Sequence, residues 1–209
     1  MNDLGVSEPI SFLALGDSYT IGESVQEEDS WPYTLAARLN RQHKFVTDPE
    51  IIAKTGWTSA ELIAGIAKSN PMRTYDLVSL QIGVNNQYRG DDIDQYRHEF
   101  RHLMDLALEF AGGYAERVIV LSIPDWSVTP FAVDRNRKII AKMIESFNSV
   151  NRYEAEAMKM NYFDITSISR LAQKNPALIA PDCLHPSAEM YSLWVDLIYP
   201  TAVCAIQTK

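Results

Sequence analysis

A serine and a histidine at opposite ends of the chain each have neighbours suited to acyl transfer. Ser18 follows an apolar run, in a Gly-Asp-Ser-Tyr turn where backbone amides can support a nucleophile. Asp182 precedes His185 by three residues near the other end of the chain. A carboxylate at this spacing can accept the imidazole Nδ1–H, fix the tautomer and leave Nε2 to take a proton from a serine. These residues predict a nucleophilic Ser-His-Asp site.

Two further loop residues could bind the negative charge that such a reaction develops. Gly56 lies two residues before a predicted helix start at Thr58, so that its N–H is free to donate to an anion. Asn85, in a Gly-Val-Asn-Asn loop, could donate its side-chain amide into the same space. Taken singly, an ordinary turn explains Gly56 equally well and explains Asn85 better. Their joint occurrence beside predicted strands favours one assembled site.

The elements that must position these residues alternate along the chain. Five short apolar runs are predicted as strands, at residues 11–15, about 50–53, 76–82, 117–123 and 161–165. Phe45 and Val46 form a competing candidate for the second strand. Longer stretches with helical periodicity separate the runs, which is typical of a parallel sheet covered on both faces.

Capping residues mark the predicted helices. The predicted helix starts lie at Ser30, at Thr58, at Asp91, near Asp134 and at Ser187. Glu61 completes a capping box with Thr58. Tyr153 falls on the apolar stripe of the fourth helix, and Pro200 is expected to bend or end the last one.

This order predicts an α/β fold in a single domain spanning residues 1–209. Its core would be a doubly wound, five-stranded parallel sheet in a three-layer α/β/α sandwich. Sites in such folds lie at the carboxyl ends of the strands. The candidate residues, which follow predicted strands or precede a helix, meet this requirement.

In these motifs the chain resembles the SGNH or GDSL hydrolases, and the resemblance extends over nearly the whole sequence. The matching residues are Gly16-Asp17-Ser18-Tyr19, Gly56, Gly83-Val84-Asn85 and the pair Asp182 and His185. The resemblance implies a flavodoxin-like sandwich and an oxyanion hole formed by the N–H groups of Ser18 and Gly56 and the side chain of Asn85. Many members have aspartate where this chain has Asn86, a difference expected to affect the pocket rather than catalysis. The G-x-S-x-G elbow of ordinary α/β-hydrolases is absent from the sequence.

The predicted reaction is hydrolysis of a carboxylic ester in two steps. His185 would take the Ser18 proton during attack, Asp182 would hold the ring, and water would then release the acid. This chemistry needs no metal or organic cofactor. Short-chain acyl or acetyl esters are the first expectation because no long apolar groove is visible. Thioesterase or lysophospholipase action on longer acyl chains is the alternative that the resemblance also implies.

Aromatic residues on the predicted loops could shape a substrate pocket or roof the core. They are Tyr19, Trp57, Tyr88, Trp126 and Phe131. Residues 125–134 are the predicted covering loop. Arg89 is either a contact for an anionic leaving group or a surface arginine.

The composition of the chain limits the classes of partner and cofactor that it is expected to bind. A formal net charge of −8 argues against a nucleic-acid surface, and two cysteines supply neither a disulfide framework nor a zinc site. No apolar run reaches the length of a membrane span, and the first ten residues lack a signal-peptide pattern, so a cytoplasmic small-molecule enzyme is expected. The oligomeric state stays open. A non-catalytic flavodoxin-like binding module would need a Gly-rich phosphate loop, and an inactive family member would usually lack one of the three catalytic residues.

Overall fold

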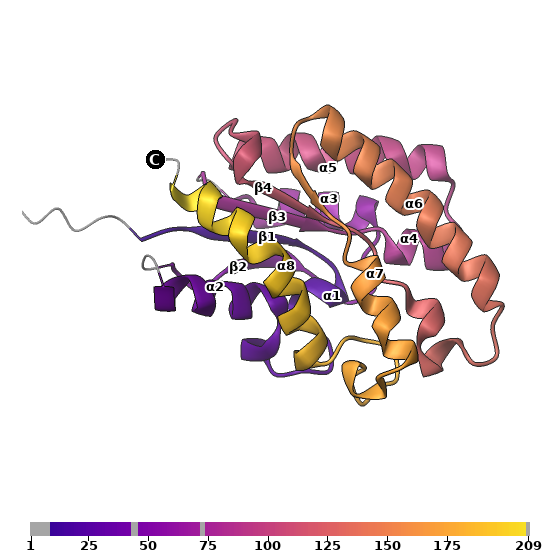
Figure 1. Cartoon of the computed structure of the whole chain (residues 1–209). Helices are drawn as coiled ribbons and strands as arrows, with labels where there is room; N and C mark the ends of the chain where they lie inside the picture. The colour runs from indigo at the N-terminus through magenta and orange to yellow at the C-terminus, as the bar shows by residue number, and fades with distance from the viewer. Residues whose placement is uncertain (1–8, 43–45, 72–73, 208–209) are drawn as a thin grey trace, which may run out of the picture.

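The computed structural model describes residues 9–42, 46–71 and 74–207, and within them five strands form one parallel sheet (Figure 1). The strands are β1 (Phe12–Gly16), β2 (Glu50–Ala53), β3 (Leu77–Gln81), β4 (Val118–Leu121) and β5 (Asn161–Phe163). Their order, β2-β1-β3-β4-β5, is that of flavodoxin-like doubly wound sheets. Every residue of β1, β3 and β4 is buried, as expected for parallel strands covered on both faces. The predicted fold class is therefore confirmed.

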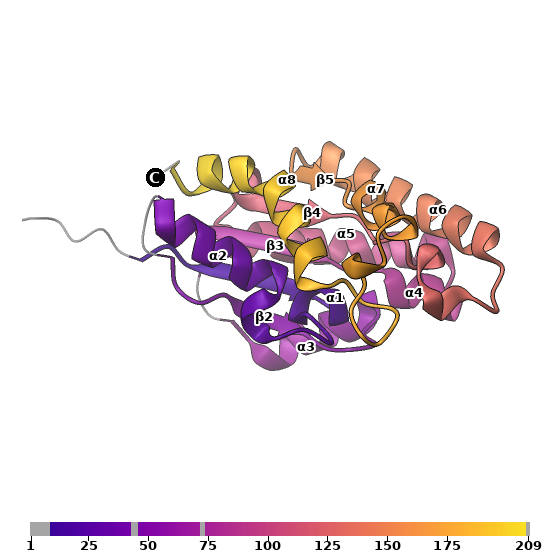
Figure 2. The ribbon, with the colours of Figure 1, turned by 60° about the horizontal axis from the view of Figure 1, so that its bottom comes forward.

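Helices cover both faces of this sheet (Figures 1 and 2). One face carries α2 (Trp31–Gln42) and α8 (Ala188–Gln207), and the other carries α3 (Ser59–Ser69), α5 (Ile93–Phe110) and α6 (Arg137–Ala157). Three short helices lie in the connections: α1 (Ser18–Ile21), α4 (Val84–Arg89) and α7 (Thr166–Ser169). No helix of the described part of the chain is long and apolar enough to cross a membrane.

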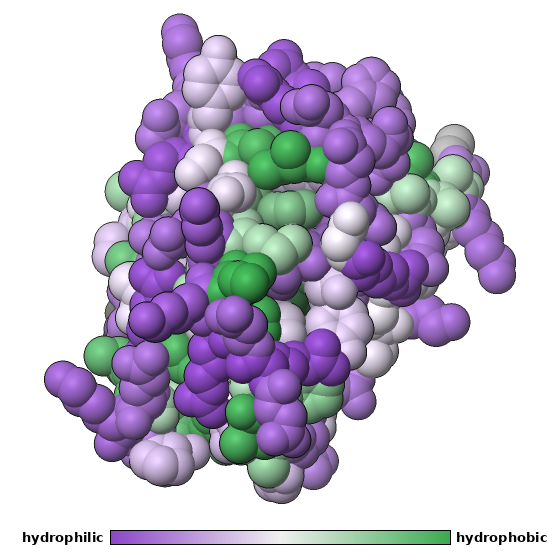
Figure 3. All heavy atoms as spheres, turned by 90° about the vertical axis from the view of Figure 1, so that its right-hand side faces the viewer, coloured by the Kyte–Doolittle hydropathy of each residue, from purple (hydrophilic) through white to green (hydrophobic). Residues whose placement is uncertain are grey.

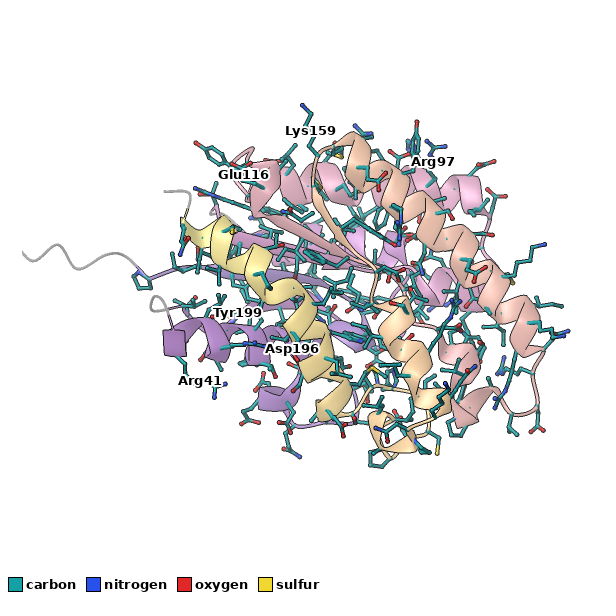
Figure 4. The ribbon with its side chains drawn as sticks, in the orientation of Figure 1. Arg41, Arg97, Glu116, Lys159, Asp196 and Tyr199 are labelled. Carbon is teal, nitrogen blue, oxygen red and sulfur yellow. The ribbon has the colours of Figure 1, made fainter. Side chains whose placement is uncertain are left out.

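The first and last long helices, α2 and α8, are fastened to each other at the surface as well as in the core. The Arg38 side chain forms an ion pair with Asp196 and stacks on Tyr199, with its Cζ 4.3 Å from the ring centroid. Figure 4 shows Asp196 and Tyr199 on the side of α8 that faces α2. Trp31 of α2 and Trp194 of α8 are fully buried. The surface contacts hold α8 against α2.

The predicted strands occur within one or two residues of their predicted ends. The competing candidate for the second strand consisted of Phe45 and Val46. Phe45 lies outside the described residues, and Val46 forms an isolated bridge with Ile10. The strand itself is β2, Glu50–Ala53, as predicted.

Two helix starts differ from the prediction because a neighbouring side chain makes the cap. Asp92, not Asp91, caps α5, because its side chain accepts the backbone N–H groups of Asp94 and Gln95. Asp91 is engaged elsewhere, since its carboxylate accepts from Asn86 over 3.1 Å. The helix predicted from about Asp134 begins at Arg137, where the Asn136 side chain accepts the N–H of Ile139 over 3.2 Å.

Two predictions about helix interiors need correction. Pro200 does not end α8: the helix continues past the proline to Gln207, and Ile198 and Ala202 on either side of it are buried. The other predicted outcome, a bend at Pro200, stays a prediction. Tyr153 is 61% exposed instead of facing the core. The buried positions beside it are polar: Asn151 accepts from the Tyr96 hydroxyl, and Glu154 forms ion pairs with arginines of α5.

Candidate active site

The predicted site residues converge at the carboxyl ends of β1, β2 and β3. Ser18 follows β1 directly, Gly56 follows β2, and Asn85 lies in the first turn of α4 after β3. In this sheet order the crevice between β1 and β3 is the topological switch point, where doubly wound folds bind ligands. Figure 3 views this end of the molecule, where apolar residues gather in the middle and hydrophilic residues surround them.

A chain of hydrogen bonds joins the predicted acid, base and nucleophile. His185 Nδ1 lies 2.6 Å from Asp182 Oδ2, and His185 Nε2 lies 3.0 Å from Ser18 Oγ. An ionised carboxylate can only accept, so that Nδ1 carries the proton and Nε2 is left to accept from the serine hydroxyl. His185 and Ser18 are buried, with 7% and 4% of their surfaces exposed.

The carboxylate of Asp182 is strongly held in its ionised form. Oδ1 accepts the backbone N–H groups of Leu184 (2.9 Å) and His185 (3.0 Å), and Oδ2 accepts the Ser24 hydroxyl (2.7 Å) beside the imidazole. Partial burial raises the pKa of Asp182, but the hydrogen bonds from Ser24, from the imidazole and from the two N–H groups outweigh it. The net effect lowers the pKa from 3.8 to about 2.

The nucleophile turn contains a second, buried carboxyl group. Asp17 caps α1 through its Oδ1, which accepts the N–H of Tyr19 over 3.0 Å, and only 1% of the residue is exposed. Burial raises the pKa of Asp17 from 3.8 to about 7, against the opposing effect of that hydrogen bond. The Tyr19 ring lies beside the imidazole of His185, with centroids 5.0 Å apart.

The two predicted oxyanion donors face the same pocket as Ser18. Gly56 has a φ of +84°, and an added Cβ would meet only an Arg89 nitrogen at 4.0 Å, so its backbone conformation and not crowding favours glycine. The Asn85 amide donates from Nδ2 to the carbonyl of Trp57 over 2.9 Å. Because a carbonyl cannot donate, this bond fixes the nitrogen of Asn85 in place and leaves its second N–H for another acceptor.

Asn86, the residue that departs from the family pattern, clamps the start of α3. Its Oδ1 accepts the N–H of Ser59 over 3.0 Å, and its Nδ2 donates to Ser59 Oγ (2.8 Å) and to Asp91 Oδ2 (3.1 Å). The Ser59 hydroxyl in turn donates to Glu99 over 2.5 Å. A carboxylate at position 86 could not donate to either partner. In this chain Asn86 holds the start of α3 in place. An amide suits the position because it can donate to the carboxylate of Asp91, whereas a second carboxylate could not.

Replacing Asn86 by aspartate is therefore expected to destabilise the fold. The new carboxylate would face Asp91 and an already committed Ser59 hydroxyl, at a cost of about 1–3 kcal/mol in the free energy of unfolding. Urea denaturation at neutral pH measures the loss. The second substitution Asp91→Asn should restore part of it by supplying a donor, and an Asn86→Asp protein as stable as its parent would contradict this account.

A pocket of about 250 Å³ opens above the nucleophile. Besides the four proposed catalytic and oxyanion residues that face it, its lining consists of Tyr19, Thr55, Val84, Tyr88, Trp126, Phe131 and Leu184. Tyr88, Trp126 and Phe131 form a triangle with centroids 5.6 to 6.4 Å apart. The Arg135 guanidinium covers all three rings at 5.0 to 5.5 Å and donates to the Tyr88 hydroxyl over 2.9 Å.

Of the five aromatic residues considered from the sequence, Trp57 does not line the pocket. Its ring packs on Gly65 of α3, where an added Cβ would lie 2.3 Å from the ring. Because Gly65 has no side chain, the Trp57 ring can occupy this space on α3 instead of the pocket. Arg89 meets protein groups, since it donates to the carbonyl of Gly56 over 2.6 Å and pairs with Glu61 at 3.2 Å. Of the predicted covering loop, residues 125–134, Trp126 and Phe131 line the pocket.

Three pocket-lining residues and one hydroxyl near the site were not anticipated from the sequence. Thr55, Val84 and Leu184 line the pocket, and the available signal was their adjacency in sequence to Gly56, Asn85 and His185. Ser24 reaches Asp182 from a loop with no motif, and nothing in its spacing points to that contact.

Solved structures with the same fold cover almost the whole chain. TesA superposes with a TM-score of 0.72 at 18% identity, covering 93% of this chain and 99% of that chain. The psychrotrophic esterase EstA from Pseudoalteromonas sp., inhibited by monoethylphosphonate, gives 0.68 at 16% identity, covering 95% and 99%. The W215I variant of Axe2, an acetyl xylan esterase from Geobacillus stearothermophilus, gives 0.69 at 18% identity, covering 93% and 96%.

Sequence comparison identifies the family directly. The curated proteins contain no match to this chain. In contrast, the profile of the GDSL-like Lipase/Acylhydrolase family matches residues 14–193, a range that includes every residue of the hydrogen-bonded chain from Asp182 to Ser18. The chain belongs to the GDSL-like lipase/acylhydrolase family and is an ester-hydrolysing enzyme.

Proposed function

We propose that the enzyme hydrolyses short-chain acyl or acetyl esters through an acyl-enzyme formed on Ser18. The observation that carries this proposal is the continuous hydrogen-bonded chain from Asp182 through His185 to Ser18 Oγ. His185 takes the hydroxyl proton as Oγ attacks the ester carbonyl, and it then returns the proton to the leaving alcohol. Water, activated by the same imidazole, attacks the acyl-enzyme and releases the acid.

Three donors meet the oxyanion that forms during each step. They are the backbone N–H groups of Ser18 and Gly56 and the second amide N–H of Asn85. All three residues line one pocket, and the bond from Asn85 to the Trp57 carbonyl orients the amide before substrate arrives. Donors fixed in advance stabilise the transition state without a cost of reorganisation, and each is worth roughly 3–4 kcal/mol in the barrier.

The preference for a short acyl chain follows from the size and lining of the pocket. Its volume of about 250 Å³ lies just below the range of roughly 300–1,000 Å³ that is usual for small-molecule sites, and its walls are mostly aromatic and aliphatic side chains. Tyr88 and Phe131 are 46% and 40% exposed, so that their free surfaces can stack on a ring of the alcohol part, such as a sugar. The likeness in fold to an acetyl xylan esterase agrees with this choice.

A series of 4-nitrophenyl esters with acyl chains from about two to about twelve carbons tests the substrate class. We expect kcat/KM to be highest for chains of about two to four carbons and to fall as the chain outgrows the pocket. Each rate is corrected with the Ser18→Ala protein, which keeps the pocket but lacks the nucleophile. A maximum above about eight carbons would favour the alternative, a thioesterase or lysophospholipase acting on longer chains.

A further inference from the structure

A three-residue segment, residues 22–24, follows α1 and contacts three parts of the site. The N–H groups of its first two residues donate to the carbonyl of Ser18. Its glutamate accepts the hydroxyl of Thr55, which lines the pocket next to Gly56. Its serine, Ser24, donates to Asp182 Oδ2 over 2.7 Å. The segment thus links the nucleophile turn to the loops that carry an oxyanion donor and the acid.

The contact from Ser24 differs in kind from the other hydrogen bonds to Asp182. Oδ1 is held by the N–H groups of Leu184 and His185, which belong to the same turn as the carboxylate. Among the hydrogen bonds of the described residues, Ser24 supplies the donor to Asp182 from outside that turn. It binds the same oxygen as the imidazole, so it fixes the rotation of the carboxylate relative to the His185 ring.

The backbone at Ser24 indicates that its hydroxyl has a role. Ser24 has a φ of +68° and is exposed, in the left-handed region that glycine occupies without strain. Gly22, two residues earlier, has a φ of +76° and is a glycine. A strained residue persists where the surroundings impose its conformation, and such residues cluster at functional sites. What serine adds over glycine at position 24 is the hydroxyl bound to Asp182.

We propose that Ser24 is a positioning residue, which holds the carboxylate of Asp182 in line with His185 and thereby raises kcat. This inference rests on the proposed function, in which Asp182 orients the imidazole that activates Ser18. Loss of the Ser24 hydroxyl leaves the imidazole as the one remaining partner of Oδ2 among the described residues, so that the carboxylate is held less firmly and the ring is presented to the nucleophile in the productive orientation less often.

The decisive variant is Ser24→Gly, which removes the hydroxyl and also relieves the backbone strain. We expect kcat for a short-chain ester to fall about 10-fold with KM within about twofold, while Tm stays the same or rises. A merely structural serine would give the opposite pattern, because relief of strain would leave kcat unchanged. Lys159→Gly is the matched control: Lys159 has a φ of +58°, and its side chain points away from the molecule in Figure 4. That variant should gain stability at constant kcat.

A second background shows whether Ser24 acts through Asp182. In an Asp182→Asn protein, the added Ser24→Gly change should cause no further loss of kcat, because the carboxylate that it positions is gone. An unchanged kcat in Ser24→Gly alone, or an equal loss in both backgrounds, would overturn the inference and leave the proposed function intact. An Asp182→Asn protein with full activity would instead overturn the role of Asp182, and the inference with it.

Discussion

Ser18→Ala is expected to reduce kcat for a 4-nitrophenyl ester by roughly 10⁶-fold. In the proposed mechanism this hydroxyl forms the acyl-enzyme, and its oxygen, at 3.0 Å, is the only hydrogen-bond partner of His185 Nε2 among the described residues. The oxyanion donors remain, so that a residual acceleration over water of roughly 10³–10⁴-fold is expected. Burst and steady-state kinetics of the purified protein measure the change.

The same variant should remain folded, because Ser18 Oγ makes its hydrogen bond to the site and not to the core. A thermal melt close to that of the parent is the control. An organophosphonate should label the parent on Ser18, detected by intact mass and peptide mapping, and should leave Ser18→Ala unlabelled. Turnover in Ser18→Ala at a rate near that of the parent would show that another residue carries the reaction.

Asp17→Asn is expected to change how the stability of the fold depends on pH. Asp17 is buried next to the nucleophile, and burial raises its pKa from 3.8 to about 7. Between these pH values the native protein keeps a proton that the unfolded chain releases, so that rising pH favours unfolding. The contribution of Asp17 to the free energy of unfolding is complete below about pH 4 and is lost as pH rises through about 7. The two pKa values, 3.8 and about 7, correspond to a loss of roughly 4 kcal/mol in the free energy of unfolding over this window.

Asparagine keeps the oxygen that accepts the Tyr19 N–H but cannot ionise. The free energy of unfolding of Asp17→Asn, relative to that of the parent, should therefore grow by roughly 4 kcal/mol from about pH 4 to about pH 7.5. Urea titrations of both proteins at matched pH values give this difference, since the remaining carboxyl groups are common to both. Two stability curves that stay parallel over the window would contradict the raised pKa of Asp17.

The sheet could be predicted because its strands are buried on both faces. Continuous apolar runs such as those of β1 and β4 carry their own signal, whatever surrounds them. Helix boundaries depend on competition between neighbours. Asp91 and Asp92 are equally good caps by type, and the choice between them follows from a contact of Asp91 with Asn86, on another element. Burial of Glu154 likewise requires two arginines that sequence periodicity does not reveal.

The positions of the proposed catalytic residues could be predicted from the sequence, whereas the contacts of the residues around them could not. Ser18, Asp182 and His185 fall in short motifs whose chemistry is tied to their spacing, and the structure brings these three residues together. The orientation of Trp57 depends on a glycine eight positions away, which a reader of the sequence has no reason to pair with it. Contacts that need one hydroxyl in one loop conformation, such as that of Ser24, leave no pattern in the sequence.

The packing of α8 on α2 has a consequence for when the protein becomes active. Ser18 and His185 are separated by 167 positions in the chain, and His185 lies shortly before α8, which begins at Ala188 and completes one face of the sheet. In a nascent chain Ser18, the proposed nucleophile, is therefore exposed long before His185, the proposed general base, has left the ribosome. Contacts of such high sequence separation form late in folding, after the loop entropy has been overcome. Ester cleavage should begin only once the C-terminal helix has docked, so that activity reports completion of the fold.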